Sequence, residues 1–151
     1  MTITRATDED FAFGQKVHHL AYREMVLRQF GEWDETVQGG FFERTWNGIP
    51  HGIVRDENGE KCGYCAVERT AEAIFLREIA LLPEWQGRGI GGAIIRDLIA
   101  EGDEKAVPVR LNVMKSNTGA RRLYERLGFR RIGETETHFQ LERIPTVFSA
   151  G

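Results

Sequence analysis

Residues Leu76–Gly92 read LREIALLPEWQGRGIGG, and this stretch decides the fold of the chain. The apolar strand predicted over Ile74–Leu82 ends at Pro83, because proline has no backbone N–H to give to a sheet. The glycine-rich turn that follows opens a helix, predicted over Gly89–Glu101 from its apolar spacing. Glycines leave backbone N–H groups accessible there, and the helix dipole adds about half a positive charge. The stretch therefore predicts a cradle for a phosphate group.

The run GRGIGG, residues 87–92, also matches the G-x-G-x-x-G pattern of dinucleotide-binding folds. In those folds the strand leads almost directly into the first glycine, and an acidic residue ends the next strand. Here residues 83–86 intervene, and the next predicted strand, Val109–Met114, is followed by Lys115. Dinucleotide binding is therefore disfavoured, and a P-loop is excluded because Gly-Lys-Ser/Thr does not occur.

Two motifs follow one another along the chain. The first is Q-x-x-G-x-G over residues 86–91, and the second is N-x-x-A-x-x-x-Y-x-x-x-G-F over residues 117–129. With both motifs in this order and spacing, the chain resembles the GNAT superfamily of N-acetyltransferases. The close match covers Ile74–Phe129, and the order of elements agrees across nearly all the rest. The resemblance implies one α/β domain over residues 1–151, with a mixed, mostly antiparallel central sheet flanked by helices.

The resemblance also implies that acetyl-coenzyme A binds with its pyrophosphate on the glycine turn. The backbone of residues 79–81 would pair with the pantetheine arm, and Asn117 would hydrogen-bond that arm from the other side. Arg88 either reaches a phosphate or is a solvated charge. No metal is expected. The coenzyme-binding residues expected are Ile79, Ala80, Leu81, Gln86, Gly87, Arg88, Gly89, Ile90, Gly91, Gly92, Asn117, Ala120 and Tyr124.

The implied reaction is direct transfer of an acetyl group from the thioester to a primary amine in a ternary complex. Attack needs a neutral amine, whereas a lysine-type amine stays protonated until pH about 10 and an α-amine until about 8. The enzyme must therefore help to remove a proton and must protonate the departing thiolate. No cysteine lies near the predicted site, so a covalent acetyl-enzyme is not expected. A non-catalytic domain that binds acyl-coenzyme A as a sensor or partner module is the alternative.

Two residues are the candidates for proton transfer. Tyr124 is the predicted acid, because the resemblance places it beside the coenzyme sulfur and a phenol can protonate a thiolate as it forms; a core tyrosine is the alternative. Glu78 is the predicted base, since the positions where many family members carry it hold Phe75 and Asn112. A water chain, or an acid from the Phe30–Glu35 loop, competes with Glu78, which could instead form a structural ion pair.

The Phe30–Glu35 segment joins two predicted helices and mixes aromatic rings with carboxylates. In the GNAT arrangement this loop overhangs the acceptor site, so Phe30 and Trp33 are candidate substrate-binding residues. The two rings could equally form a packing corner between the helices. The sequence does not name the acceptor, and the acidic balance of this region favours a cationic small amine or a peptide amine.

Composition narrows the class of protein. The chain has 151 residues and a formal net charge of −3, which fits one domain with a sizeable core. No basic face or arm indicates nucleic acid, and the apolar runs are too short to span a membrane. The N-terminus lacks the apolar segment of a signal peptide, so a cytoplasmic protein is expected. Oligomeric state stays open, and a homodimer is compatible with the sequence.

Cys62 and Cys65 form a C-x-x-C pair, which is typical of redox sites and of half a zinc site. Both fall on a predicted strand, Lys61–Thr70, where residues three apart point to opposite faces. No second cysteine pair exists, and the four histidines are scattered. The favoured interpretation is that both cysteines are small apolar residues of the strand.

The other elements follow from periodicity and turn signals. Val17, Leu20, Ala21 and Met25 are expected on the inward side of the first helix. Val37, Phe41 and Phe42 are expected inward on the second, and Gly102 is expected to end the third. The tail Pro145–Gly151 is expected to be frayed. The remaining predicted strands are Thr2–Ala6, His51–Asp56, Phe129–Gly133 and Thr137–Ile144, and the remaining predicted helices are about Asp8–Arg28, Glu35–Trp46 and 117–127.

Overall fold

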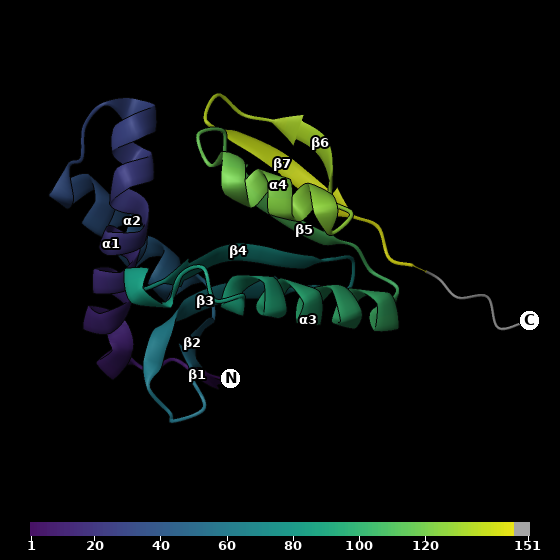
Figure 1. Ribbon diagram of the computed structural model, residues 1–151, viewed down its shortest axis with the longest axis horizontal. Helices are drawn as coiled ribbons and strands as arrows, with labels where there is room; N and C mark the ends of the chain where they lie inside the picture. Colours follow the sequence, from purple (N-terminus) through teal and green to yellow (C-terminus); the bar gives the residue numbers. More distant parts are fainter. Residues whose placement is uncertain (147–151) are drawn as a thin grey trace, which may run out of the picture. The chain divides into compact units, whose positions relative to one another are not determined.

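Figure 1 shows the computed structural model, which describes residues 1–146. The strands are β1 (Thr2–Arg5), β2 (His51–Arg55), β3 (Lys61–Arg69), β4 (Ile74–Leu81), β5 (Val109–Met114), β6 (Arg130–Glu134) and β7 (His138–Arg143). The helices are η1 (Asp8–Asp10), α1 (Phe11–Phe30), α2 (Glu35–Gly48), η2 (Pro83–Trp85), α3 (Ile90–Lys105) and α4 (Thr118–Arg126).

Hydrogen bonds link the strands in the order β1-β2-β3-β4-β5-β7-β6. β4 and β5 run parallel, whereas the pairs β1–β2, β2–β3, β5–β7 and β6–β7 are antiparallel. The predicted fold class, a mixed and mostly antiparallel sheet flanked by helices, is confirmed. Most predicted elements lie within one or two residues of their observed bounds.

The chain divides into two compact units. The first unit comprises Met1–Val67 and Arg77–Gly91, and the second comprises Glu68–Leu76 and the chain from Gly92 onward. β4 and α3 each contribute residues to both units. Of the tail that was predicted to fray, residues 147–151 lie outside the described residues. The backbone N–H of Thr146 bonds to Asp103 Oδ1 at 2.8 Å, so the tail is anchored up to that point.

In the first unit, α1 begins and ends at clear sequence signals. The backbone N–H of Thr7 donates to Asp10 Oδ2 at 2.9 Å and fixes the turn that precedes the helix. The helix ends at Gly31, whose φ of +80° is a left-handed conformation that glycine adopts without strain. α2 begins where Asp34 Oδ1 accepts from the N–H of Val37 at 3.0 Å.

The predicted inward faces of these two helices were partly wrong. Val17 is fully buried on α1, but Leu20 is half exposed because it lies two residues, roughly 160° around the helix, from the buried His18. On α2, Phe42 is fully buried, whereas Phe41 is about half exposed. Val37 lies one turn before Phe41 on the same side and is exposed too.

The core of the first unit combines residues from both helices and three strands. Gly63 on β3 lies directly against the backbone of β4: a Cβ atom there would overlap the carbonyl oxygen of Ala80 and lie 2.8 Å from Leu81 Cα. Glycine at position 63 therefore lets the two strands approach each other at the end of β4. The core residues are Val17, Phe42, Ile53, Tyr64, Ala80 and Leu82.

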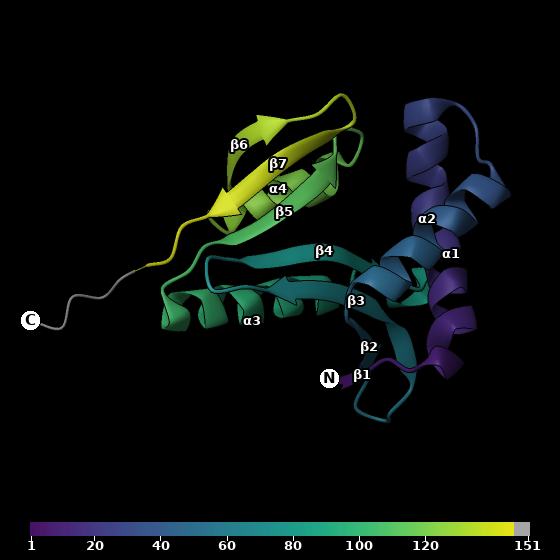
Figure 2. The same ribbon diagram turned by 180° about the vertical axis from the view of Figure 1, so that it is seen from behind.

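In the second unit, α4 lies along β5 and β7 in the two opposite views (Figures 1 and 2). The prediction that Gly102 ends the third helix was wrong, since α3 continues to Lys105. A Cβ atom at Gly102 would lie 2.9 Å from the Val107 carbonyl oxygen and 3.0 Å from Val109. This glycine serves close packing inside the helix, and the chain turns only at Ala106, whose φ is +57°.

Cys62 and Cys65 both lie on β3, buried and unbonded to each other. Burial is the main cause that raises the pKa of the Cys62 thiol, which makes it less reactive. Both cysteines therefore behave as small core residues, as the strand assignment predicted. Across residues 1–146, no helix combines the length and the apolar character that crossing a bilayer requires.

We predict that Gly63→Ala destabilises the protein by about 3 kcal/mol, because the added methyl group meets backbone that cannot rotate away. Gly48→Ala is the matched control, since a Cβ atom at Gly48 meets nothing within 4 Å at the end of α2. That variant should be neutral or gain up to about 1 kcal/mol. Urea unfolding of both variants measures the difference, and equal midpoints would contradict the close approach.

Candidate functional site

The glycine turn before α3 has the geometry of an anion cradle. Gly87 and Gly89 have φ values of +74° and +82°, and a Cβ atom at either position would meet nothing within 4 Å. Because α3 begins at Ile90, the N–H groups of its first turn have no carbonyl partner within the helix. The backbone is thus open where an anion such as a phosphate would approach.

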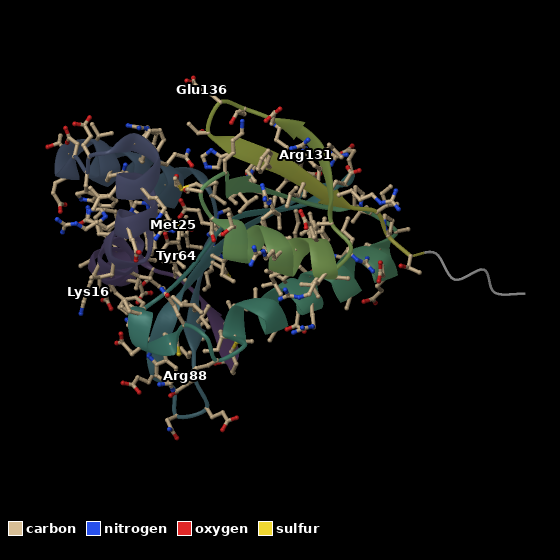
Figure 3. All side chains as sticks on the ribbon, turned by 45° about the horizontal axis from the view of Figure 1, so that its top comes forward. Lys16, Met25, Tyr64, Arg88, Arg131 and Glu136 are labelled. Atoms are coloured by element: carbon tan, nitrogen blue, oxygen red, sulfur yellow. The ribbon has the colours of Figure 1, made fainter. Side chains whose placement is uncertain are left out.

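Side chains on either side hold this turn in place. The Gln86 side-chain amide donates to the Leu81 carbonyl at 3.0 Å and ties the turn back to the end of β4. The Arg88 guanidinium stacks over Trp85, 4.7 Å from the ring centroid. Arg88 is exposed at the rim of the first unit, whereas Tyr64 lies among its core side chains (Figure 3).

Three polar side chains of the first unit meet at the end of β4. The Tyr64 hydroxyl, on β3, donates to Glu78 Oε2 at 2.6 Å. The Tyr22 hydroxyl, on α1, donates to the carbonyl oxygen of Ile79 at 3.1 Å. Glu78, the predicted base, is half-buried and therefore lies in a hydrogen-bonded polar group beside the apolar core.

Burial dominates the electrostatics of this group. Desolvation raises the pKa of Glu78 above its ordinary value, and the hydrogen bond from Tyr64 opposes that shift because it favours the charged carboxylate. Desolvation and the neighbouring Glu78 charge raise the pKa of Tyr64 well above 10. At neutral pH, Tyr64 is a permanent donor, and Glu78 is a stronger proton acceptor than an exposed carboxylate.

The second motif forms the start of α4, in the second unit. Asn117 caps the helix, because its Oδ1 accepts from the N–H of Ala120 at 3.2 Å. Tyr124 is 8% exposed and packs against Phe129, with ring centroids 5.8 Å apart. Within residues 1–146, no hydrogen bond engages the Tyr124 hydroxyl, and burial raises its pKa to about 12. The hydroxyl is therefore protonated and free to donate.

The Phe30–Glu35 segment separates its two candidate residues. Phe30 is 53% exposed, so it forms no packing corner. Trp33 is half-buried and meets the His19 ring edge-on at 5.2 Å. Its indole Nε1 is buried with no hydrogen-bond partner among the described residues. The Glu35 carboxylate lies 3.4 Å from His19 Nε2.

The structure brings together residues that sequence reasoning did not single out. The histidines looked scattered along the sequence, yet His18 and His51 both contact the Phe42 ring, at centroid distances of 5.4 and 6.4 Å. The His51 ring also lies 5.5 Å from that of Tyr64. In the sequence, the position of His18 beside Val17 in the apolar pattern of a helix indicates that its ring faces the core. Tyr64 carries no comparable signal beyond its position on a predicted strand.

The predicted site residues fall in both units. Glu78, residues 79–81 and residues 86–91 belong to the first unit. Gly92, Asn117, Ala120 and Tyr124 belong to the second. Their roles in catalysis and coenzyme binding stay predictions. The contacts within each unit name the atoms that those predictions concern.

Comparisons with known proteins agree with the motifs. The family model described as "Acetyltransferase (GNAT) family" matches residues 15–129. The chain is 29% identical over 83 residues to the ribosomal protein bS18-alanine N-acetyltransferase of Haemophilus influenzae, covering 55% of this chain and 57% of the relative. It is 34% identical over 139 residues to an uncharacterized N-acetyltransferase of Methanocaldococcus jannaschii, covering 85% and 60%. The chain thus spans about three fifths of the length of these relatives.

Solved structures share the fold at low identity. The ribosomal-protein-S18-alanine N-acetyltransferase of Escherichia coli has a TM-score of 0.69 at 21% identity, covering 99% of this chain and 97% of its own. The PaiA N-acetyltransferase of Thermoplasma acidophilum, solved in complex with coenzyme A, has a TM-score of 0.70 at 17% identity, covering 95% and 99%.

We predict that the protein loses stability as the pH falls from about 6.5 to about 4. Burial, and secondarily the neighbouring His19, lower the pKa of His18 to about 4. The unfolded chain therefore takes up a proton near pH 6.5 while the folded chain does not, and the loss amounts to about 3 kcal/mol. Urea midpoints against pH should show a shallower fall for His18→Asn than for the wild type. Parallel curves would contradict the burial of a neutral His18.

Proposed function

The chain belongs to the GNAT family of acetyltransferases, and on that premise we propose that it transfers an acetyl group from acetyl-coenzyme A to a primary amine. The observation that carries the proposal is the open glycine turn at Gly87 and Gly89, which offers backbone donors and a helix N-terminus to a phosphate. Acetyl-coenzyme A supplies the activated thioester when it is bound. The amine attacks that thioester directly, without a covalent enzyme intermediate.

The coenzyme is held by backbone more than by side chains in this proposal. The N–H groups of residues 87–92 receive the pyrophosphate, and the backbone of residues 79–81 faces the pantetheine arm. The Gln86 amide shapes the turn through Leu81, and Arg88 adds positive charge at the exposed rim. Asn117 contributes through the helix start that it caps at Ala120.

Glu78 is the proposed base. A primary amine is protonated at neutral pH, so attack requires that its proton leave. The raised pKa of the half-buried Glu78 brings this carboxyl nearer to the pKa of the amine, which favours proton transfer. Two of the three acids of the competing Phe30–Glu35 loop are engaged elsewhere, since Asp34 caps α2 and Glu35 lies beside His19.

Tyr124 is the proposed acid for the departing thiolate. Its hydroxyl has no hydrogen-bond partner within residues 1–146, and a pKa of about 12 keeps the proton on the phenol in the resting enzyme. The phenol donates a hydrogen bond to the sulfur as negative charge develops there, and a tyrosinate formed by proton transfer is the stronger base and takes a proton back from solvent. A purely structural tyrosine this deeply buried would normally use its hydroxyl in a hydrogen bond.

The acceptor that we propose is the α-amine of a peptide or protein. Two of the relatives are named for the acetylation of an alanine in a ribosomal protein, which supports an amine of this class. An α-amine has a pKa of about 8, compared with about 10 for a lysine-type amine, so a carboxylate base deprotonates it more easily.

An acceptor screen tests the activity. Thiol release from acetyl-coenzyme A would be followed with peptides that carry free N-terminal residues, with the same peptides blocked at the N-terminus, and with polyamines and aminosugars. Turnover on free peptides alone supports the α-amine. Turnover on small cationic amines would overturn the proposed α-amine and identify such amines as the acceptor class. Tight coenzyme binding with no turnover on any amine favours the non-catalytic alternative.

We predict that acetyl-coenzyme A raises the melting temperature, and that Gly89→Asp abolishes the rise. A ligand at one hundred times its Kd stabilises the native state by about 2.7 kcal/mol, and a carboxylate at Gly89 would repel the pyrophosphate. Gly59→Asp is the matched control, because Gly59 has the same left-handed φ of +80° and the same open surroundings but lies in the β2–β3 turn.

Both glycine variants should lose about 1 kcal/mol without ligand, since both force a side chain into the left-handed region. Only the variant at position 89 should lose the ligand shift, as measured by thermal denaturation with and without acetyl-coenzyme A. An equal ligand shift in both variants would remove the glycine turn from the coenzyme site. Stabilisation by NADH in place of acetyl-coenzyme A would overturn the proposed cosubstrate.

We predict that Tyr124→Phe lowers kcat about 10²-fold or more, with little change in the Kd of acetyl-coenzyme A. The ring and its packing on Phe129 remain, so stability should change by about 1 kcal/mol or less. Because the pKa of Tyr124 is about 12, the loss should be uniform between pH 7 and 10. Steady-state kinetics across that range test this, and wild-type turnover in the variant would make Tyr124 a core residue only.

A further inference from the structure

We propose that Tyr64 is a positioning residue for Glu78: its hydroxyl occupies one carboxylate oxygen and leaves the other to receive the proton of the acceptor amine. The inference rests on the proposed function, in which Glu78 is the base. Nothing in the motifs points to Tyr64, which stands outside both of them. It follows from the contact between two side chains on neighbouring strands.

The contact between the two side chains is short and one-sided. Tyr64 Oη donates to Glu78 Oε2 at 2.6 Å, a distance typical of a hydrogen bond to a charged acceptor. Among the described residues, no hydrogen bond involves Glu78 Oε1. The carboxylate therefore has one oxygen that is already engaged and one that remains available, which fixes the side from which it can accept a proton.

Packing fixes the position of the donor itself. Tyr64 is completely buried, and its ring lies 5.7 Å from that of Phe42 and 5.5 Å from that of His51. A ring enclosed on these sides cannot turn its hydroxyl away. Because Gly63 precedes it in close contact with β4, the strand that carries Tyr64 is also held near Glu78.

The proton movement follows from this arrangement. As the acceptor ammonium reaches the site, an N–H bond breaks and an O–H bond forms at Glu78 Oε1, while the amine nitrogen keeps the electron pair that attacks the thioester. Tyr64 keeps its own proton throughout, since burial and the adjacent carboxylate hold its pKa well above 10. It acts through Glu78 and does not exchange protons with the substrate.

The groups around Glu78 leave Tyr64 as its specific partner. Tyr22 on α1 approaches the same region, but its hydroxyl donates to the Ile79 carbonyl. His18 lies against the Tyr22 ring, with centroids 5.1 Å apart, and is neutral at physiological pH. Arg77 precedes Glu78 on β4 and is exposed, since adjacent strand residues point to opposite faces. Of the two causes that shift the pKa of Glu78, the hydrogen bond from Tyr64 is the one that opposes burial.

The first experiment is a pH–rate profile of Tyr64→Phe. The acidic limb of kcat/KM should move to higher pH by about one to two units, the span that one hydrogen bond to a charged group supports. The kcat at pH 7 should fall about tenfold or more, while the Kd of acetyl-coenzyme A changes less than twofold. An acidic limb at the wild-type position overturns the inference.

Tyr22→Phe is the matched control. It removes another phenol hydroxyl from the same polar group, and this hydroxyl donates to the backbone carbonyl of Ile79. Its acidic limb should stay at the wild-type position. An equal shift in both variants would mean that any lost hydroxyl loosens the site, and this would also overturn the inference.

A second experiment measures the ionisation of Glu78 directly. It does not depend on turnover, and it keeps the Tyr64 side chain intact. Site-specific incorporation of 3,5-difluorotyrosine at position 64 keeps the ring and the hydrogen bond but makes the phenol a stronger donor. The Glu78 carboxyl, titrated by ¹³C NMR, should then ionise at lower pH than in the wild type, and in Tyr64→Phe at higher pH. An unchanged titration in the fluorinated protein contradicts the inference even if Tyr64→Phe does not fold.

Glu78→Gln separates this inference from the proposed base. The amide oxygen of glutamine still accepts from Tyr64, so the fold should persist while the base is lost, and kcat should fall about 10²-fold. If Glu78→Gln retains wild-type turnover, Glu78 is not the base and both proposals fall. If it loses turnover but Tyr64→Phe keeps the wild-type acidic limb, only the role of Tyr64 falls.

Discussion

The end of β4 is the constraint on which the rest of the molecule depends. The N–H of Leu82 still bonds to the Cys62 carbonyl at 2.8 Å, but Pro83 has no N–H to continue the ladder. The chain must leave the sheet there, and glycines at positions 87 and 89 supply the left-handed turns that redirect it into α3. An open helix N-terminus is consequently presented directly beyond the strand that carries Glu78.

Polar groups in the core of the first unit cost stability that the fold recovers by pairing them. Glu78 and Tyr64 satisfy one another, and Tyr22 satisfies a backbone carbonyl at the end of the same strand. His51 donates through Nδ1 to Ile49 at 2.7 Å, yet its Nε2 is buried without a partner in the described chain. Unsatisfied groups of this kind reduce stability, and proteins carry them mainly at functional sites.

The second motif has a structural role and a proposed chemical one. Asn117 starts α4 by accepting from the N–H of Ala120, so capping gives this residue a structural role whether or not a coenzyme is bound. Tyr124 differs, because its packing against Phe129 would be served as well by phenylalanine. The hydroxyl is the part of Tyr124 that packing does not explain, and this makes it informative about function.

Local chemistry let the sequence alone determine the glycine turn, the end of β4 at Pro83 and the family, because each depends on short motifs of residues close together in the chain. The inward faces of α1 and α2 were partly mispredicted at Leu20 and Phe41, because burial depends on which elements pack against a helix. Only the tertiary structure brought Tyr64 to Glu78, fourteen positions apart on separate strands. Strand pairing decides that contact, since neither residue type carries a local signal for the other.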